Sequence, residues 1–108
     1  MSADFPESDW RRFKEVHAKL MERYCEGVLE EVESVSQDTK NSAYDRYIKI
    51  FNLVRERNKE MARAFDDYRR STAVMQLGIM RRMRLLKDDD LKKFSELTQT
   101  RVEGIASI

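Results

Sequence analysis

The sequence predicts an all-α protein: an antiparallel helical hairpin with a short third helix, which becomes a coiled-coil-like bundle when it dimerises. Three observations lead to this prediction. The 108 residues include only three glycines and one proline, too few for the many turns of an all-β fold. Charged residues make up 38% and hydrophobic residues 41%, a balance that suits amphipathic helices. Apolar residues also recur at helical spacing, and a chain of this length is expected to form one domain over residues 1–108.

The first helix is expected over residues 9–36, after a loose leader at residues 1–7. Ser8 or Asp9 can cap its start, because both side chains accept hydrogen bonds from the free N–H groups of a first turn. The apolar positions of this helix follow one another every three or four residues and form one face. They are Phe13, Val16, Leu20, Tyr24, Val28, Val32 and Val35.

A line of glutamates runs along another face of this helix, where Glu22, Glu26 and Glu30 follow one another at spacings of four. This line has two interpretations, a paired-carboxylate enzyme site or a solvated acidic face. We favour the solvated face, because no histidine stands at the Glu-x-x-His spacing that di-metal helical bundles use.

The second helix is expected over residues 40–87, and the sequence leaves open a kink near residue 71. The short polar connection before it makes the two helices antiparallel neighbours. Asp38, Thr39 or Ser42 can cap its start. A heptad stripe continues through this helix for about five heptads. Its members are Tyr44, Tyr47, Phe51, Val54, Asn58, Met61, Phe65, Tyr68, Thr72, Met75 and Ile79.

The apolar face is unusually wide at the start of the second helix, wider than the seam of a two-stranded coiled coil needs. This end is therefore expected to contact more than one helix. The wide face is formed by Tyr44, Tyr47, Ile48, Ile50, Phe51, Leu53 and Val54. Further along, Asn58 places a polar side chain on the stripe, and we interpret it as a residue that fixes register and partner number.

The third helix is expected over residues 89–104. At 1.5 Å per residue, the second helix would be roughly 70 Å long and the first roughly 42 Å. The far end of the second helix would then extend beyond the first, and the third could cover only one side of it. A homodimer is expected to bury the remaining apolar surface. The predicted dimer interface consists of Tyr68, Thr72, Met75, Ile79, Met80, Met83 and Leu86.

Basic residues are concentrated between Arg69 and Lys87, in the same part of the second helix as the predicted dimer interface. Residues 1–38 carry a net charge of −5 and residues 39–108 a net charge of +6, so the two halves can neutralise each other within the fold. Arginine side chains also suit phosphate groups, which makes a nucleic-acid-binding accessory protein the alternative function. Its predicted contacts are Arg69, Arg70, Arg81, Arg82, Arg84 and Lys87. An acidic protein partner, or a membrane surface bound by residues 75–87, would use similar chemistry.

No catalytic, metal or cofactor motif stands out, so the protein is expected to be a non-enzymatic interaction or scaffold module that binds itself and another protein. His17 and Cys25 are interpreted as structural, since no recognisable catalytic or zinc site includes them. A single cysteine fits a reducing compartment, and residues 1–9 lack the apolar run of a signal peptide. No stretch approaches the roughly 20 apolar residues of a membrane span. A cytoplasmic protein without a cofactor is therefore expected.

Overall fold

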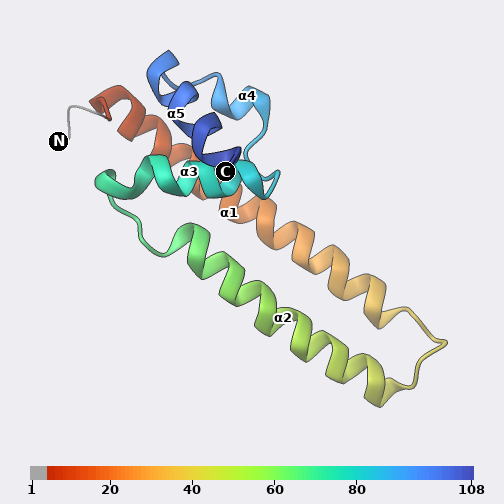
Figure 1. Cartoon of the computed structure of the whole chain (residues 1–108). Coiled ribbons are helices and arrows are strands. Elements are labelled where there is room, and N and C mark those ends of the chain that lie inside the picture. Colours follow the sequence, from red (N-terminus) through yellow and green to blue (C-terminus); the bar gives the residue numbers. More distant parts are fainter. Residues whose placement is uncertain (1–4) are drawn as a thin grey trace.

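The structure, a computed structural model, describes residues 5–108, and these residues form helices and no strand. Two long helices run antiparallel along one side of a molecule that measures 55 × 25 × 23 Å (Figure 1). Three shorter helices gather at the end that holds the N-terminal half of the first helix. In chain order the helices are α1 (Glu7–Ser36), α2 (Ala43–Phe65), α3 (Ala73–Arg82), α4 (Asp88–Leu91) and α5 (Glu96–Ala106).

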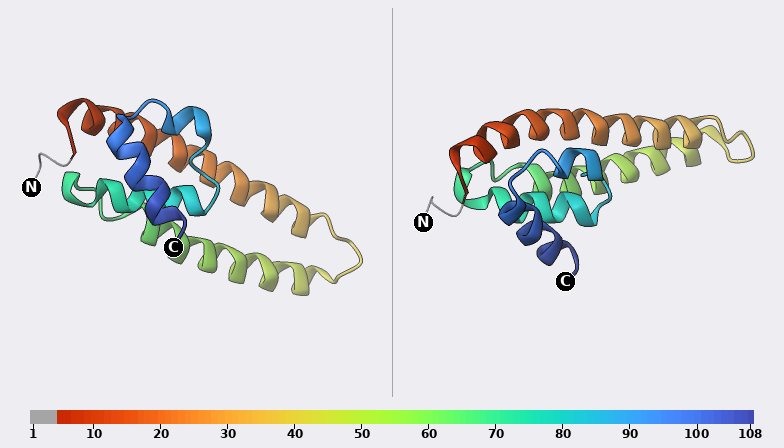
Figure 2. Two further views of the ribbon diagram at one scale, coloured as in Figure 1. Left: turned by 45° about the horizontal axis from the view of Figure 1, so that its top comes forward. Right: turned by 90° about the horizontal axis from the view of Figure 1, so that it is seen from above.

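Two parts of this structure are used below. The arm (residues 21–59) contains the second half of α1, the connecting turn and most of α2. The head (residues 5–20 and 60–108) contains everything else that the structure describes. Figure 2 shows α3 and α5 on one side of the layer that α1 and α2 form, so the arm extends from the head as a two-helix hairpin.

α1 begins two residues earlier than the expected 9–36, and Pro6 stands at its N-cap. The predicted cap Asp9 is instead 3% exposed and turns its carboxylate toward α5. Part of the expected loose leader is ordered in the core, since Phe5 is buried and Glu7 already belongs to α1. Residues 1–4 of that leader lie outside the described residues.

α2 begins after Ser42, whose side chain accepts a hydrogen bond of 3.1 Å from the N–H of Asp45. Of the three caps expected for this helix, Ser42 is therefore the one that the structure contains. The turn before it is closed by Arg46, which donates to the backbone oxygen of Ser36 at 2.6 Å.

The prediction of a continuous second helix over residues 40–87 is wrong, because α2 ends at Phe65; the break lies at residues 66–72, around the kink near residue 71 that the sequence left open. His17 on α1 places its Nε2 3.1 Å from the carbonyl oxygen of Phe65, which has no further turn of helix to bond. The chain then turns back through one 3₁₀ turn over Arg70–Thr72 (η2) before α3 begins.

Hydrogen bonds hold this reversal in place. The hydroxyl of Thr72 donates to the backbone oxygens of Asp67 and Arg69. Arg70 donates to the backbone oxygen of Phe5 at 2.9 and 3.1 Å and pairs with Glu7 at 2.8 Å. The Arg70 contacts join residues more than sixty positions apart, so local spacing alone could not predict where the helix would stop.

The segment expected as one third helix, 89–104, is also divided, into α4 and α5. Ser95 caps α5 by accepting a hydrogen bond from the N–H of Thr98. α3 packs closely against α5: a Cβ added to Gly78 would lie 2.7 Å from the Cβ of Ile105. The head core is built from all of these helices and contains Phe13, Val16, Leu20, Phe65, Leu77, Met80, Leu86, Leu91, Phe94 and Val102.

This packing removes the uncovered overhang on which the predicted dimer interface depended. Met80 and Leu86 are 0% and 1% exposed inside the head, so neither can belong to a surface. The segment that contains Met75, Met80 and Met83 folds back and is sheltered largely by its own chain. Over residues 5–108, none of the helices combines the length and apolar character that a membrane span would need.

Candidate interaction surface

An apolar strip on α2 faces solvent. Tyr44, Tyr47, Phe51 and Val54 follow one another at spacings of three and four, which places them on one side of the helix. All four are exposed to solvent, and Phe51 is 56% exposed. These four residues are the first members of the predicted heptad stripe, so the start of that stripe is not covered by any helix among residues 5–108.

A shallow groove of about 450 Å³ follows this strip. It is lined by Tyr47, Ile50, Phe51, Val54, Arg55 and Asn58. The guanidinium of Arg55 lies 5.6 Å from the centre of the Phe51 ring, a distance at which a cation is attracted to an aromatic face.

α1 contacts α2 along a different face. The phenol of Tyr24 donates to the backbone oxygen of Arg57 at 2.9 Å and to Glu60 at 2.7 Å. Arg57 in turn pairs with Glu31 at 2.8 Å. Burial and the hydrogen bond to Glu60 raise the pKa of the Tyr24 phenol, which therefore stays protonated as a donor. These contacts hold the hairpin together without using the strip.

The arm therefore has a head-side face and an opposite face. Gly27 and Glu31 of α1 line a hollow on the head-side face, together with Glu60 of α2 and Leu85 of the head. Leu29 is two residues from both Gly27 and Glu31, and two residues rotate a helix by roughly 200°. Leu29 consequently faces away from the head, and it is 63% exposed.

The same reasoning applies to α2. Asn58 is two residues from Glu60, so it also faces away from the head. Because Asn58 lines the groove with Phe51 and Val54, the strip and Leu29 lie on the same side of the hairpin. We call this side the arm face; its apolar members are Leu29, Tyr44, Tyr47, Phe51 and Val54. Figure 2 shows it as the side of the α1–α2 layer opposite α3 and α5.

Sequence reasoning singled out Asn58 but missed Leu29. Asn58 is exposed at the head end of the strip, where no helix among residues 5–108 covers it. Leu29 lies off the stripe that α1 uses to contact its own chain, so its position indicated nothing by itself. The signal that was present is the excess width of the apolar face at residues 44–54.

The fold divides the residues of the predicted dimer interface: Met80 and Leu86 are buried in the core, while Met75, Ile79 and Met83 line one groove. The Tyr68 ring lies 4.4 Å from the ring of His17 and 5.8 Å from those of Trp10 and Phe13, while Thr72 closes the reversal. A second groove, of about 390 Å³, collects the outward-facing members of α3. It is lined by Glu60, Arg63, Met75, Ile79, Arg82, Met83 and Ile105.

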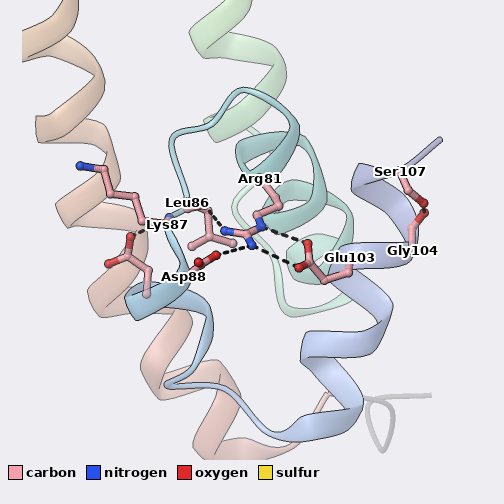
Figure 3. A network of polar contacts seen from close by, with 8 residues as sticks. Arg81, Leu86, Lys87, Asp88, Glu103, Gly104 and Ser107 are labelled. Carbon is pink, nitrogen blue, oxygen red and sulfur yellow. Dashed lines mark hydrogen bonds and ion pairs between the residues drawn. The ribbon is translucent and has the colours of Figure 1, made fainter.

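Most of the predicted nucleic-acid contacts bind acidic groups or carbonyls of the same chain. Arg81 lies between α4 and α5, where it donates to Asp88 at 2.6 Å and to Glu103 at 3.0 Å (Figure 3). It also donates to the backbone oxygen of Leu86 at 2.9 Å. Hydrogen bonds to Glu103 and Asp88 raise the pKa of Arg81. This guanidinium is therefore a structural link between α3, α4 and α5.

The other basic residues of this segment divide into two groups. Arg69 pairs with Asp67 at 2.7 Å, and Arg82 donates to the backbone oxygen of Ile105 at 3.0 Å. Arg84 and Lys87 are exposed, and neither side chain is ion-paired within residues 5–108. Arg84 has φ 63°, a left-handed conformation that ends α3. Arg81, Arg84 and Lys87 line one pocket of about 330 Å³ together with Asp88, whereas Arg69 and Arg70 lie at the other end of α3.

The other candidate residues form no chemical site. His17 is packed between Phe13, Phe65 and Tyr68, and Cys25 is half-buried on α1. Over residues 5–108, no three histidine, cysteine or acidic side chains are grouped so that they could hold a metal ion. No protein-family model matches the chain, and no curated protein or solved structure compared with it matches either.

Proposed function

We propose that this chain is a non-enzymatic protein–protein interaction module that forms a helical homodimer through the arm face. The observation that carries this proposal is the exposed apolar strip of α2, continued by Leu29 of α1. Large contiguous apolar patches on otherwise polar proteins commonly mark interaction sites.

The energetics favour a covered arm face. Full burial of a large apolar side chain contributes about 1.5–3 kcal/mol, and the five apolar members of the arm face are only partly sheltered in the monomer. The arm is a single layer of two helices, and helical proteins normally bury such a layer against further helices. A helical partner therefore supplies what the hairpin lacks.

A second copy of the chain fits this requirement. In a two-fold dimer the same patch is used by both copies, so an apolar face needs no separate partner surface. Two hairpins stacked through their arm faces form a four-helix, coiled-coil-like bundle. Asn58, a polar residue at the head end of the strip, then has the register role that its sequence position predicts.

Nucleic-acid binding by residues 69–87 has less support. Arg69, Arg70 and Arg81 each pair with a carboxylate of the same chain, and releasing them would cost those contacts. Arg84 and Lys87 remain exposed, but two cations contribute little to binding a phosphate backbone.

Light scattering during size-exclusion chromatography tests the proposal. The wild-type chain is expected to elute with the mass of a dimer, and Phe51→Glu with the mass of a monomer, because a carboxylate cannot be buried unpaired in the interface. Leu97→Glu is the matched control, since Leu97 is similarly exposed but lies on α5 in the head. It is expected to remain a dimer.

Circular dichroism establishes that each variant is still helical. A monomeric wild-type chain at concentrations well above micromolar would overturn the proposal. So would a Phe51→Glu variant that is as dimeric as the wild type.

A further inference from the structure

Opposite charges line the two long edges of the arm face. Glu22 and Glu26 stand seven and three residues before Leu29, so they border it on the outer side of α1. Arg55 follows Phe51 by four residues and Lys59 follows Arg55 by four, along the outer side of α2. All four charged side chains are exposed.

The acidic edge has no ion-pair partner within residues 5–108. Two ion pairs join residues of the arm to each other: Glu31 with Arg57, and Glu56 with Lys59 at 3.5 Å between two exposed side chains. Such a surface pair is worth little, so Lys59 can also serve a second carboxylate. Glu22 and Glu26 keep a negative charge beside an apolar face that we propose to be covered.

The two edges also lie at matching heights along the arm. Tyr24 on α1 bonds to both Arg57 and Glu60 on α2, so residue 24 is level with residues 58–59. Because the helices are antiparallel, each later residue of α1 lies level with an earlier residue of α2, one for one. Glu26 is therefore level with the interval between Arg55 and Lys59.

We propose that the acidic edge of α1 is the binding surface for the basic edge of α2 of a second copy, in a dimer whose two-fold axis runs parallel to the arm. This inference rests on the proposed function, and it names the partner surface and its orientation. Rotation about such an axis places α1 of each copy over α2 of the other and leaves heights unchanged. Glu26 of one copy then meets Arg55 and Lys59 of its partner, twice per dimer.

The alternative two-fold axis runs across the arm. It places α1 over α1 and α2 over α2, which brings the glutamate edges of both copies together. Like charges placed opposite each other across an interface disfavour that arrangement. The charge pattern therefore selects the parallel axis, which also puts both heads at the same end of the four-helix arm.

Cysteine cross-linking tests the orientation. Counting five residues along each helix from the level of Tyr24 shows that Leu29 is level with Val54. Two single-cysteine proteins, Leu29→Cys and Val54→Cys, are prepared in a Cys25→Ala background and given tags of different mass. We expect a disulfide-linked heterodimer when they are mixed under mild oxidation, and little cross-linking of either protein alone.

A charge-reversal cycle tests the edges. Glu26→Lys and Lys59→Glu are each expected to raise the dissociation constant of the dimer about tenfold, because attraction between the edges becomes repulsion. The double variant Glu26→Lys/Lys59→Glu should recover most of the wild-type affinity. Glu96→Lys is the matched control: it makes the same charge change at an exposed glutamate, but on α5 in the head and away from the arm face. It is expected to leave the dissociation constant within about twofold, given screening by salt.

The outcomes separate the two proposals. A dimer in which Leu29→Cys cross-links to itself, or in which mixing gives no heterodimer, would overturn the parallel arrangement and leave the homodimer standing. A failure of Lys59→Glu to rescue Glu26→Lys would also overturn the assignment of the edges. A wild-type monomer would instead remove the proposed function, and the orientation with it.

Discussion

Thr98 Oγ1 donates a hydrogen bond of 2.6 Å to the carboxylate of Asp9, across 89 residues of sequence. Both side chains are buried, with exposures of 0% and 3%. The same carboxylate accepts from the N–H of Ser95 at 2.9 Å and from its hydroxyl at 2.6 Å. Asp9 therefore attaches the start of α5 to the first turn of α1, where the positive end of the α5 dipole also favours a negative charge.

Replacing Asp9 by asparagine should destabilise the head. The NH₂ group of an asparagine would face the hydroxyl and N–H donors of Ser95 and Thr98, from which it cannot accept a hydrogen bond. Buried hydrogen-bonding groups would then be left unpaired. We expect the free energy of unfolding to fall by about 2–3 kcal/mol, measured by urea denaturation at pH 7. Asp66→Asn, at an exposed aspartate, should change it by less than about 0.5 kcal/mol. Equal values for both variants would show that this link contributes nothing.

Asp9 also shows what the sequence could not predict. An aspartate just before an apolar-periodic segment is a reasonable N-cap, but nothing local indicates that the helix starts earlier and that the side chain serves α5. The end of α2 is similar, because the contact of His17 with Phe65 joins different helices. Helix type follows from periodicity within one segment, whereas helix ends here depend on tertiary contacts.

The arm face was predictable in part, for the same reason. Residues 44–54 show an apolar face too wide for one neighbouring helix, and that pattern is local. Whether the part of this apolar face that α1 does not cover contacts the same chain or solvent depends on where α3 and α5 pack. The fold places them on the other side of the hairpin (Figure 2). Residues 73–86 are also rich in apolar side chains, and there the fold buries Met80 and Leu86.

Asp90 should make stability depend on pH below about 4. Burial alone raises its pKa, but hydrogen bonds from Arg23, Lys19 and the N–H of Lys87 outweigh that effect and lower the pKa to about 2. Because the folded state holds this proton less tightly than the unfolded chain, the stabilisation is fully present above the ordinary pKa of 3.8. It is lost as the pH falls from about 4 toward 2, and it amounts to about 2 kcal/mol.

Urea denaturation of wild type and Asp90→Asn at several pH values checks this prediction. The variant should be less stable than wild type at pH 7, and its free energy of unfolding should fall less steeply between pH 4 and 2. Asp89→Asn, at an exposed neighbour, should keep the wild-type pH profile. A variant whose acid profile is as steep as that of wild type would assign the acid sensitivity to other carboxylates.

Gly78 and Gly27 should respond in opposite ways to substitution by alanine. Both are helical, and alanine normally stabilises a helix by about 1 kcal/mol relative to glycine. A Cβ at Gly27 meets nothing within 4 Å among residues 5–108, so Gly27→Ala should gain about that amount. A Cβ at Gly78 would lie 2.7 Å from the Cβ of Ile105, and the overlap should cost about 1–3 kcal/mol.

The double variant Gly78→Ala/Ile105→Ala separates the steric clash from other effects. Removing the Ile105 side chain beyond its Cβ should recover part of the loss in thermal midpoint if α3 and α5 are in close contact. Ile105→Ala alone should be destabilising, since Ile105 packs against α3. If Gly78→Ala were as stable as Gly27→Ala, α5 would have to be able to move away from α3 at little cost.

Gln76 is the remaining anomaly in the head, because its side chain is buried and its amide is unused. It is 2% exposed on α3, and neither Nε2 nor Oε1 has a hydrogen-bond partner within residues 5–108. A buried amide without partners costs roughly 1–3 kcal/mol. Methionine has a similar shape and no such requirement, so Gln76→Met should raise the free energy of unfolding by about 1–2 kcal/mol.

Gln99→Met provides the opposite case: Gln99 donates to the backbone oxygen of Phe94 at 2.8 Å, and losing that bond should cost about 1 kcal/mol. Urea denaturation measures both variants. Equal destabilisation of the two would contradict this prediction, because it would mean that the Gln76 amide forms hydrogen bonds in solution and that α3 and α5 pack less closely than the structure shows.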